Sequence, residues 1–272
     1  MSGTYLSVAS WEPRFVLGVT ESLNSGAFDR LFIIYSARSG SKTRASRQKL
    51  AELCKSSGTT YIEKELDFDN QVSVVLGLMA IFPEVSEGGC DIVFDLSTSP
   101  RDIILFILSN AAKVREKISV VYYPAEKYSP WLARETGIPR MIIGSSGIMY
   151  PDKQTCVIAL CANEISRIEQ VYYHLEPSKI VLLSDKDRSK YGEIESLSTN
   201  MMSISSFVEF DHKDISKENM RFIFEIADRN REYNTVMIST GPKIGVLHIF
   251  ATIMHNEEIG AAYIPSMYYN DE

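Results

Sequence analysis

The feature that most constrains the fold is a repeat, because four apolar blocks of the first half recur in the same order in the second. The last two pairs of blocks align at nearly the same offset along the chain. Four blocks in register predict an internal duplication with a boundary near residue 150. The paired blocks are 4–10 with 155–162, 30–36 with 179–184, 91–108 with 235–253, and 117–129 with 259–270.

Each copy alternates short strand-like runs with helical stretches. The runs are rich in Val, Ile, Leu, Phe and Tyr without strict alternation, which is typical of parallel strands buried on both faces. Helices between the strands indicate βαβ units with right-handed crossovers. We therefore expect an α/β chain of two tandem Rossmann-like domains, residues 1–150 and 151–272, each with a mainly parallel sheet of about five strands flanked by helices. The expected strands lie near 4–10, 30–36, 59–66, 91–97, 118–124, 155–161, 179–184, 206–210, 235–240 and 260–264.

Composition supports a globular protein outside the membrane. Hydrophobic residues make up 45% and charged residues 23%, close to the average for soluble domains. No apolar run reaches the roughly 18 residues of a membrane span, and the first residues do not read as a signal peptide. We expect a cytoplasmic protein. Four scattered cysteines predict no disulfide framework, and Cys156 and Cys161 are expected as core thiols.

The charge is unevenly distributed. The net charge is -7, with 16 basic and 16 acidic residues before residue 151 but 12 and 19 after it. An acidic balance argues against non-specific duplex DNA binding, whereas a small polyanion in a local cleft is compatible with it. The one basic cluster is expected to be a solvated loop and helix start, and it contains Arg38, Lys42, Arg44 and Arg47.

The fourth strand of each copy is followed by the same kind of turn. The first copy has Ser97-Thr98-Ser99-Pro100-Arg101, and the second has Ser239-Thr240-Gly241-Pro242-Lys243. Small polar residues suit a helix cap and proline suits the first helical position, so free N–H groups and the helix dipole point out of the sheet. The alternatives are ordinary caps or two anion sites, and their duplication favours anion sites.

The first and fifth strands also end in recurring polar residues. An acid followed by an arginine comes after each first strand and suits either helix capping or contacts to a base, ribose and phosphate. A tyrosine after each fifth strand suits either base stacking or packing between domains. The residues are Ser10, Glu12, Arg14, Asn163, Glu164, Arg167, Tyr128 and Tyr269.

Several familiar motifs are absent. There is no GxGxxG after the first strand, no Walker loop, no HExxH and no paired CxxC, so we expect no dinucleotide cofactor, no other cofactor and no metal. The four histidines are isolated along the chain, and His248 is expected as a satisfied core residue. Asp95 stands among apolar neighbours, where it suits either a structural ion pair or a catalytic base. Asp95 and Glu12 are the two catalytic candidates, and neither completes a triad.

A Rossmann-like domain whose site is built from the first and fourth strand ends, with a small-polar turn before a cation, resembles the CARF family (CRISPR-associated Rossmann fold). Two such domains in one chain also resemble SAVED-type sensors. The resemblance implies a cyclic oligoadenylate or related nucleotide signal in antiviral defence, sometimes with slow cleavage of that signal. It implies that the site is lined by Ser97, Thr98, Arg101, Ser239, Thr240 and Lys243, with Ser10 and Asn163 from the first strands.

Three functions follow from these patterns. The first is a nucleotide-binding sensor or regulator that holds a phosphate-rich, cyclic-oligonucleotide-type ligand in a pseudo-two-fold cleft and signals to a separate effector protein. The second is a nucleotide- or phosphosugar-processing enzyme of phosphodiesterase or hydrolase type. The third is a scaffold subunit of a larger defence complex. We expect binding rather than catalysis, with no membrane or duplex DNA partner, and leave a homo-oligomer open.

Overall fold

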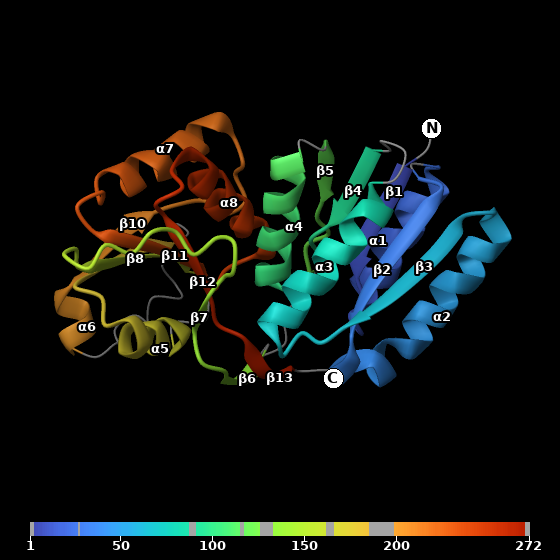
Figure 1. The fold of residues 1–272 in the computed structure, drawn as a ribbon, viewed down its shortest axis with the longest axis horizontal. Coiled ribbons are helices and arrows are strands. Elements are labelled where there is room, and N and C mark those ends of the chain that lie inside the picture. Colours follow the sequence, from blue (N-terminus) through green and yellow to red (C-terminus); the bar gives the residue numbers. More distant parts are fainter. Residues whose placement is uncertain are drawn as a thin grey trace. The chain divides into compact units, whose positions relative to one another are not determined.

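The structure is a computed structural model, and it describes residues 3–26, 28–86, 91–114, 117–125, 133–161, 166–184 and 199–269. The chain divides into two compact units, Met1–Pro130 and Trp131–Asn270. We call them unit 1 and unit 2 and describe each by itself (Figure 1).

Unit 1 is built on a five-stranded parallel sheet with the order β3-β2-β1-β4-β5. The chain moves outward from β1 to β3, then returns to the other side of β1, so β1 and β4 flank the point where the strand order reverses. Ligands of open parallel sheets bind beyond the carboxyl ends of strands at such a point. The elements are β1 (Gly3–Val8), α1 (Pro13–Asn24), β2 (Arg30–Ser36), η1 (Ala37–Ser39), α2 (Gly40–Ser57), β3 (Thr60–Leu66), α3 (Gln71–Val85), β4 (Asp91–Asp95), α4 (Arg101–Val114) and β5 (Ile118–Val121).

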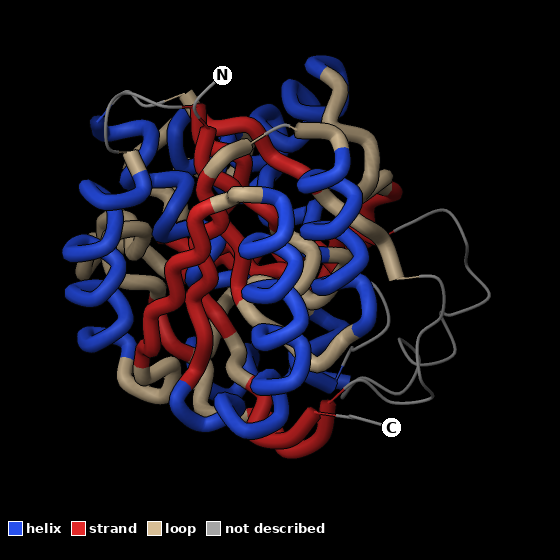
Figure 2. Tube along the Cα trace, turned by 90° about the vertical axis from the view of Figure 1, so that its right-hand side faces the viewer, coloured by secondary structure: helices blue, strands red, loops and turns tan. Residues whose placement is uncertain are grey.

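Helices lie on both sides of the strands (Figure 2). On one face α1 contacts α2, and their apolar side chains pack with those of β1 and β2 in a core that includes Tyr5, Phe15, Leu31 and Leu50. The pair α3 and α4 contact each other and complete the unit. Burial of both sheet faces explains why β1 and β2 are nearly continuous apolar runs.

Unit 2 repeats this arrangement and adds one strand. Its sheet has the order β10-β9-β8-β11-β12-β7, of which the first five are parallel neighbours in the same order as in unit 1. The predicted fold class, two Rossmann-like α/β domains, is confirmed. The elements are β6 (Ala133–Thr136), β7 (Arg140–Met141), β8 (Thr155–Cys161), α5 (Ser166–Leu175), β9 (Lys179–Ser184), α6 (Thr199–Ser203), β10 (Ser205–Glu209), α7 (Lys217–Asp228), β11 (Asn234–Ser239), η4 (Lys243–Gly245), α8 (Val246–His255), β12 (Gly260–Tyr263) and β13 (Ser266–Tyr269).

The units divide after Pro130, earlier in the chain than the expected boundary near residue 150, because β7 belongs to the sheet of unit 2. It pairs antiparallel with β12. The turn after β7 also contacts β12, because the Ala261 N–H donates to the Ser145 carbonyl at 2.7 Å. Gly147 has φ +65°, and a Cβ there would lie 2.4 Å from the Gly260 nitrogen. Only glycine suits both the conformation and this close approach.

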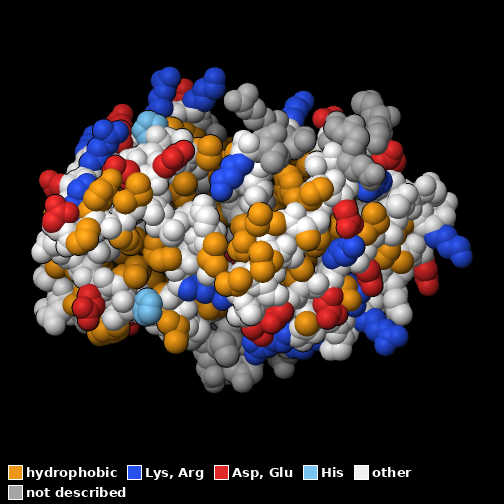
Figure 3. All heavy atoms as spheres, in the orientation of Figure 1, with side chains coloured by type: hydrophobic (Ala, Val, Ile, Leu, Met, Phe, Trp, Pro, Cys, Tyr) orange, Lys and Arg blue, Asp and Glu red, His pale blue; other side chains and the backbone are white. Residues whose placement is uncertain are grey.

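Helix α3 has an apolar outer surface. Its exposed residues include Val72, Leu76 and Met79, spaced along one stripe and each more than half exposed, and Glu84 is its one charged residue. Hydrophobic side chains are visible on the face of the molecule that carries this helix (Figure 3). Within the described ranges, no helix combines the length and the hydropathy that a membrane crossing needs.

The cysteines of the described chain are core residues. Cys54, Cys156 and Cys161 are buried free thiols, as expected for the last two. Burial raises the pKa of Cys54 to about 11 and that of Cys156 to about 12. These thiols are therefore protonated at neutral pH and act as small apolar side chains.

Candidate functional site

Sheet register brings the predicted site residues of each unit to one edge. In unit 1, Leu6 pairs with Phe94, so the residues after β1 and β4 leave the sheet side by side. In unit 2, Leu160 pairs with Ser239, which places the end of β8 beside the turn after β11. The two candidate sites are thus equivalent in topology.

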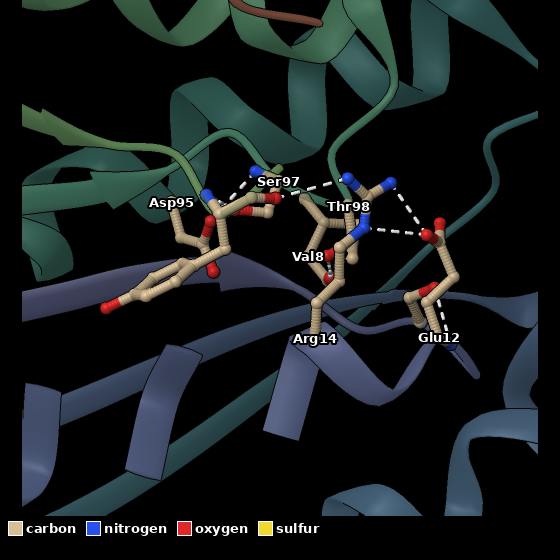
Figure 4. A network of polar contacts seen from close by, with 8 residues as sticks. Val8, Glu12, Arg14, Asp95, Ser97 and Thr98 are labelled. Carbon is tan, nitrogen blue, oxygen red and sulfur yellow. Dashed lines mark hydrogen bonds and ion pairs between the residues drawn. The ribbon is translucent and has the colours of Figure 1, made fainter. Parts of the chain in front are cut away.

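In unit 1 the turn after β4 is held by its own hydrogen bonds (Figure 4). Thr98 Oγ1 donates to the Val8 carbonyl at 2.7 Å, and Ser99 Oγ donates to the Asp95 carbonyl at 3.0 Å. Ser97 Oγ accepts from the Tyr123 N–H at 2.8 Å. All three predicted hydroxyl residues therefore tie the turn to β1, β4 and the segment after β5.

Asp95 supports the same turn from inside the sheet. Asp95 is fully buried. Its carboxylate accepts hydrogen bonds from the Ser97 N–H at 2.8 Å and from the Ser7 hydroxyl at 3.4 Å. Burial, followed by the charge of Asp95, raises the pKa of Tyr5. These contacts give Asp95 a supporting position under the backbone and keep it away from solvent, which does not suit a general base acting on a bound substrate.

Residues after β1 form a second set of contacts in unit 1 (Figure 4). Ser10 Oγ accepts the Glu12 N–H at 3.1 Å. The Glu12 carboxylate pairs with the Arg14 guanidinium at 2.6 Å, and Arg14 also donates to the Tyr123 carbonyl at 3.2 Å. The predicted acid and arginine are thus brought together, and they link the start of α1 to the segment after β5.

The equivalent arginine of unit 2 has the same structural contact. Arg167, which is 6% exposed, donates to the Ile264 carbonyl at 3.4 Å and to Ser266 Oγ at 2.6 Å. Tyr123 and Ile264 occupy matching positions in the last repeated block, each directly before a proline. A guanidinium that ties the first helix to the end of the fifth strand accounts for this recurring arginine.

The turn after β11 in unit 2 is less well satisfied than its counterpart. The Thr240 N–H donates to the Leu160 carbonyl at 2.9 Å, but Ser239 Oγ and Thr240 Oγ1 are buried and have no hydrogen-bond partner within the described part of the chain. Buried hydroxyls normally have a hydrogen-bond partner, so these two need one that the described residues do not supply, such as a water molecule or a ligand.

These hydroxyls lie beside the start of α8. A Cβ placed on Gly245, the N-cap of α8, would lie 3.6 Å from Ser239 Oγ and 3.9 Å from His212 Nδ1. Gly245 provides no side-chain cap, and the first turn of α8 carries no acid. Lys243 follows the turn and is partly exposed. The N–H groups of Gly245 and Val246 already donate to carbonyls of the preceding turn, so the hydroxyls and the ammonium are the groups that can hold a phosphate or carboxylate here.

Two histidines expected to be isolated are neighbours in unit 2. The rings of His212 and His248 both pack edge-on against Phe210, with centroid distances of 5.5 and 4.9 Å. His248 is a core residue as expected, but it is not satisfied, since neither ring nitrogen has a hydrogen-bond partner in the described structure. Burial lowers the pKa of His248 to about 4, although a polar contact with the His212 backbone opposes this shift. Sequence spacing offers no signal for this cluster, because the two histidines lie far apart along the chain.

Two residues of the basic cluster contact aromatic rings in unit 1. Arg47 lies 3.7 Å from the Tyr35 ring centroid and pairs with Glu63 at 2.8 Å, while Lys42 lies 5.7 Å from the Trp11 ring centroid. Burial raises the pKa of Glu63, but hydrogen bonds from Arg47 and Tyr61 outweigh it and lower that pKa. Arg47 thus links α2 to β3 and is not part of a solvated face.

Four of the predicted residues fall wholly or partly outside what the structure describes. Tyr128, Asn163 and Glu164 lie outside the described residues, and for Tyr269 only the backbone is described, paired with Ala133 between β13 and β6. Among the described residues, no three His, Cys, Asp or Glu side chains gather as a group that could hold a metal ion.

Comparisons with known proteins add little to this geometry. No family model matches the chain, and no curated protein matches it. A universal stress protein from Archaeoglobus fulgidus is 10% identical with a TM-score of 0.28, covering 99% of this chain and 97% of its own. The N-domain of a bacterial malonyl-CoA reductase, solved with NADP, is 11% identical with a TM-score of 0.26, covering 94% and 79%. Such low similarity says nothing about ligand or reaction.

Proposed function

We propose that the protein is a nucleotide-binding sensor or regulator whose phosphate-bearing ligand binds at the carboxyl edge of a sheet, beside the turn that follows the fourth strand. The CARF-like resemblance makes a cyclic oligonucleotide the first ligand class to test. It also suggests a role in antiviral defence with a separate effector protein. A homo-oligomer is compatible with this role.

One observation carries the proposal: the buried hydroxyls of Ser239 and Thr240 have no partner within the described residues, and they lie beside Gly245 at the start of α8. A phosphate oxygen accepts hydrogen bonds from such hydroxyls. Lys243 supplies the opposite charge a few residues later. The acidic balance of the chain does not oppose this, because the local field at a helix N-terminus decides the affinity.

Binding is favoured over catalysis because the candidate base is already engaged. Asp95 is fully buried and accepts hydrogen bonds from Ser97 and Ser7. Glu12, the other candidate, is paired with Arg14. The proposal therefore assigns these carboxylates to the support of unit 1, and the ligand to the buried hydroxyls of Ser239 and Thr240 and the partly exposed Lys243 in unit 2.

A thermal-shift screen, followed by calorimetric titration of every hit, tests the proposal. The panel contains mono-, di- and triphosphate nucleotides and cyclic di-, tri-, tetra- and hexanucleotides. A ligand present at 100 times its Kd adds about 2.7 kcal/mol of stability and raises Tm by several degrees. The variant Lys243→Ala should reduce the shift, whereas Lys217→Ala, at an exposed lysine on α7, should preserve it. No shift with any nucleotide would overturn the proposal.

A further inference from the structure

We propose that the duplicated turns have diverged, so that only unit 2 binds the anionic group of the ligand and unit 1 keeps its turn as a closed structural element. This inference rests on the proposed function, which places a phosphate beside a turn after a fourth strand. It adds that each chain holds one such anion, bound through Ser239, Thr240 and Lys243.

The two turns differ in whether their hydroxyl groups have hydrogen-bond partners. The hydroxyls of Ser97, Thr98 and Ser99 are all used inside unit 1. A ligand there would have to break bonds that the protein already makes. The matching hydroxyls of Ser239 and Thr240 are buried and have no partner within the described residues, so a ligand oxygen that reached them would replace no existing hydrogen bond of theirs.

The two turns also differ in the buried acidic residues beside them. In the alignment of the two copies that pairs Ser97 with Ser239, Asp95 corresponds to Met237 and Asp102 corresponds to Ile244. Both carboxylates are at most 8% exposed, and Asp102 accepts the N–H of the adjacent Ile103 at the start of α4. An anion at the turn of unit 1 would approach two buried carboxyl groups. Unit 2 has none at either position.

The start of α8 lacks the acidic side chain that is present at the start of α4. The first turn of α4 contains Asp102, whereas that of α8 contains no acid and is capped by glycine. Thr240 is 6% exposed with an unpartnered hydroxyl, and Ser239 Oγ lies against the Gly245 N-cap. Within the described residues of unit 2, the unpartnered hydroxyls and a helix start without an acid therefore lie at the same place.

The test titrates the full-length protein with tripolyphosphate, a phosphate chain without a base, and with the best nucleotide of the screen. We expect one site per chain. Lys243→Ala and Ile244→Asp should each weaken binding about tenfold or more, the first by removing a cation and the second by installing the acid of unit 1. Ile244→Asn should bind as the parent does, which separates charge from loss of packing. Arg101→Ala should change the affinity less than about twofold.

Each outcome is informative about a different claim. Two sites per chain, or equal losses in Arg101→Ala and Lys243→Ala, would overturn the inference and leave nucleotide binding intact. Tripolyphosphate binding that depends on Lys243, with no response to nucleotides, would support the inference and remove the proposed sensor role. If neither probe binds up to about 10 mM, both claims fail.

Discussion

Replacing His248 with leucine should remove much of the acid sensitivity of unit 2. The side chain of His248 is fully buried against Phe210, and burial lowers its pKa from 6.5 to about 4. Between pH 6.5 and 4 the ring of His248 therefore stays neutral in the folded state but is protonated in the unfolded chain. Stability is fully present above pH 6.5, declines as the pH falls toward 4, and changes no further below that value. The shift corresponds to roughly 3 kcal/mol.

The assay is urea denaturation at pH values between 7.5 and 4, with hydrogen exchange of the β11 amides assigning the transition to unit 2. The parent should lose roughly 3 kcal/mol more than His248→Leu across this range. His174→Gln, at an exposed histidine on α5, is the matched control and should keep the parent's slope. Parallel profiles for the parent and His248→Leu would refute the reasoning, because they would mean that the buried ring is not the group being protonated.

Three further substitutions test the supports of the two units. Asp95→Ala strands the buried Ser97 N–H and should cost about 1–3 kcal/mol in urea denaturation; an unchanged midpoint would contradict the support role. Gly147→Ala forces a side chain against the Gly260 backbone and should cost about 2–4 kcal/mol, seen as a lower Tm, whereas a neutral effect would mean that the turn relocates freely. Arg47→Met removes an ion pair and a cation–ring contact, and a loss of about 1 kcal/mol or less in the same measurement is expected because the partner carboxylate is partly exposed.

Sequence reasoning succeeded where burial alone decides the outcome. The runs 179–184 and 30–36 are strands with the predicted bounds, because residues packed on both faces of a sheet must be apolar throughout. The repeat predicted the same alternation of strands and helices in both halves, and the five parallel strands of each unit have the same order. Short β7 was missed because its two residues carry no periodic signal.

The sites were harder to predict because residue types do not reveal their partners. Ser97 and Ser239 occupy equivalent positions, yet only the hydroxyl of Ser97 has a hydrogen-bond partner among the described residues. That partner is the Tyr123 N–H, which comes from the segment after β5. Two differences visible in the alignment of the copies, Asp95 against Met237 and Asp102 against Ile244, are the signals that could have separated them. The contact of His212 and His248 through Phe210 depends on how α8 packs, which spacing does not encode.

The pairing of β7 with β12 determines where the chain can be cut. β12 is the last parallel strand of unit 2, and β7 covers it as an outer antiparallel neighbour. A fragment that began at residue 151 would expose the N–H and C=O groups of β12 as a bare sheet edge. Such an edge recruits strands from other chains and leads to aggregation. A fragment that began at Trp131 would carry its own protective strand, so solubility of the isolated second half should depend on the segment 131–150.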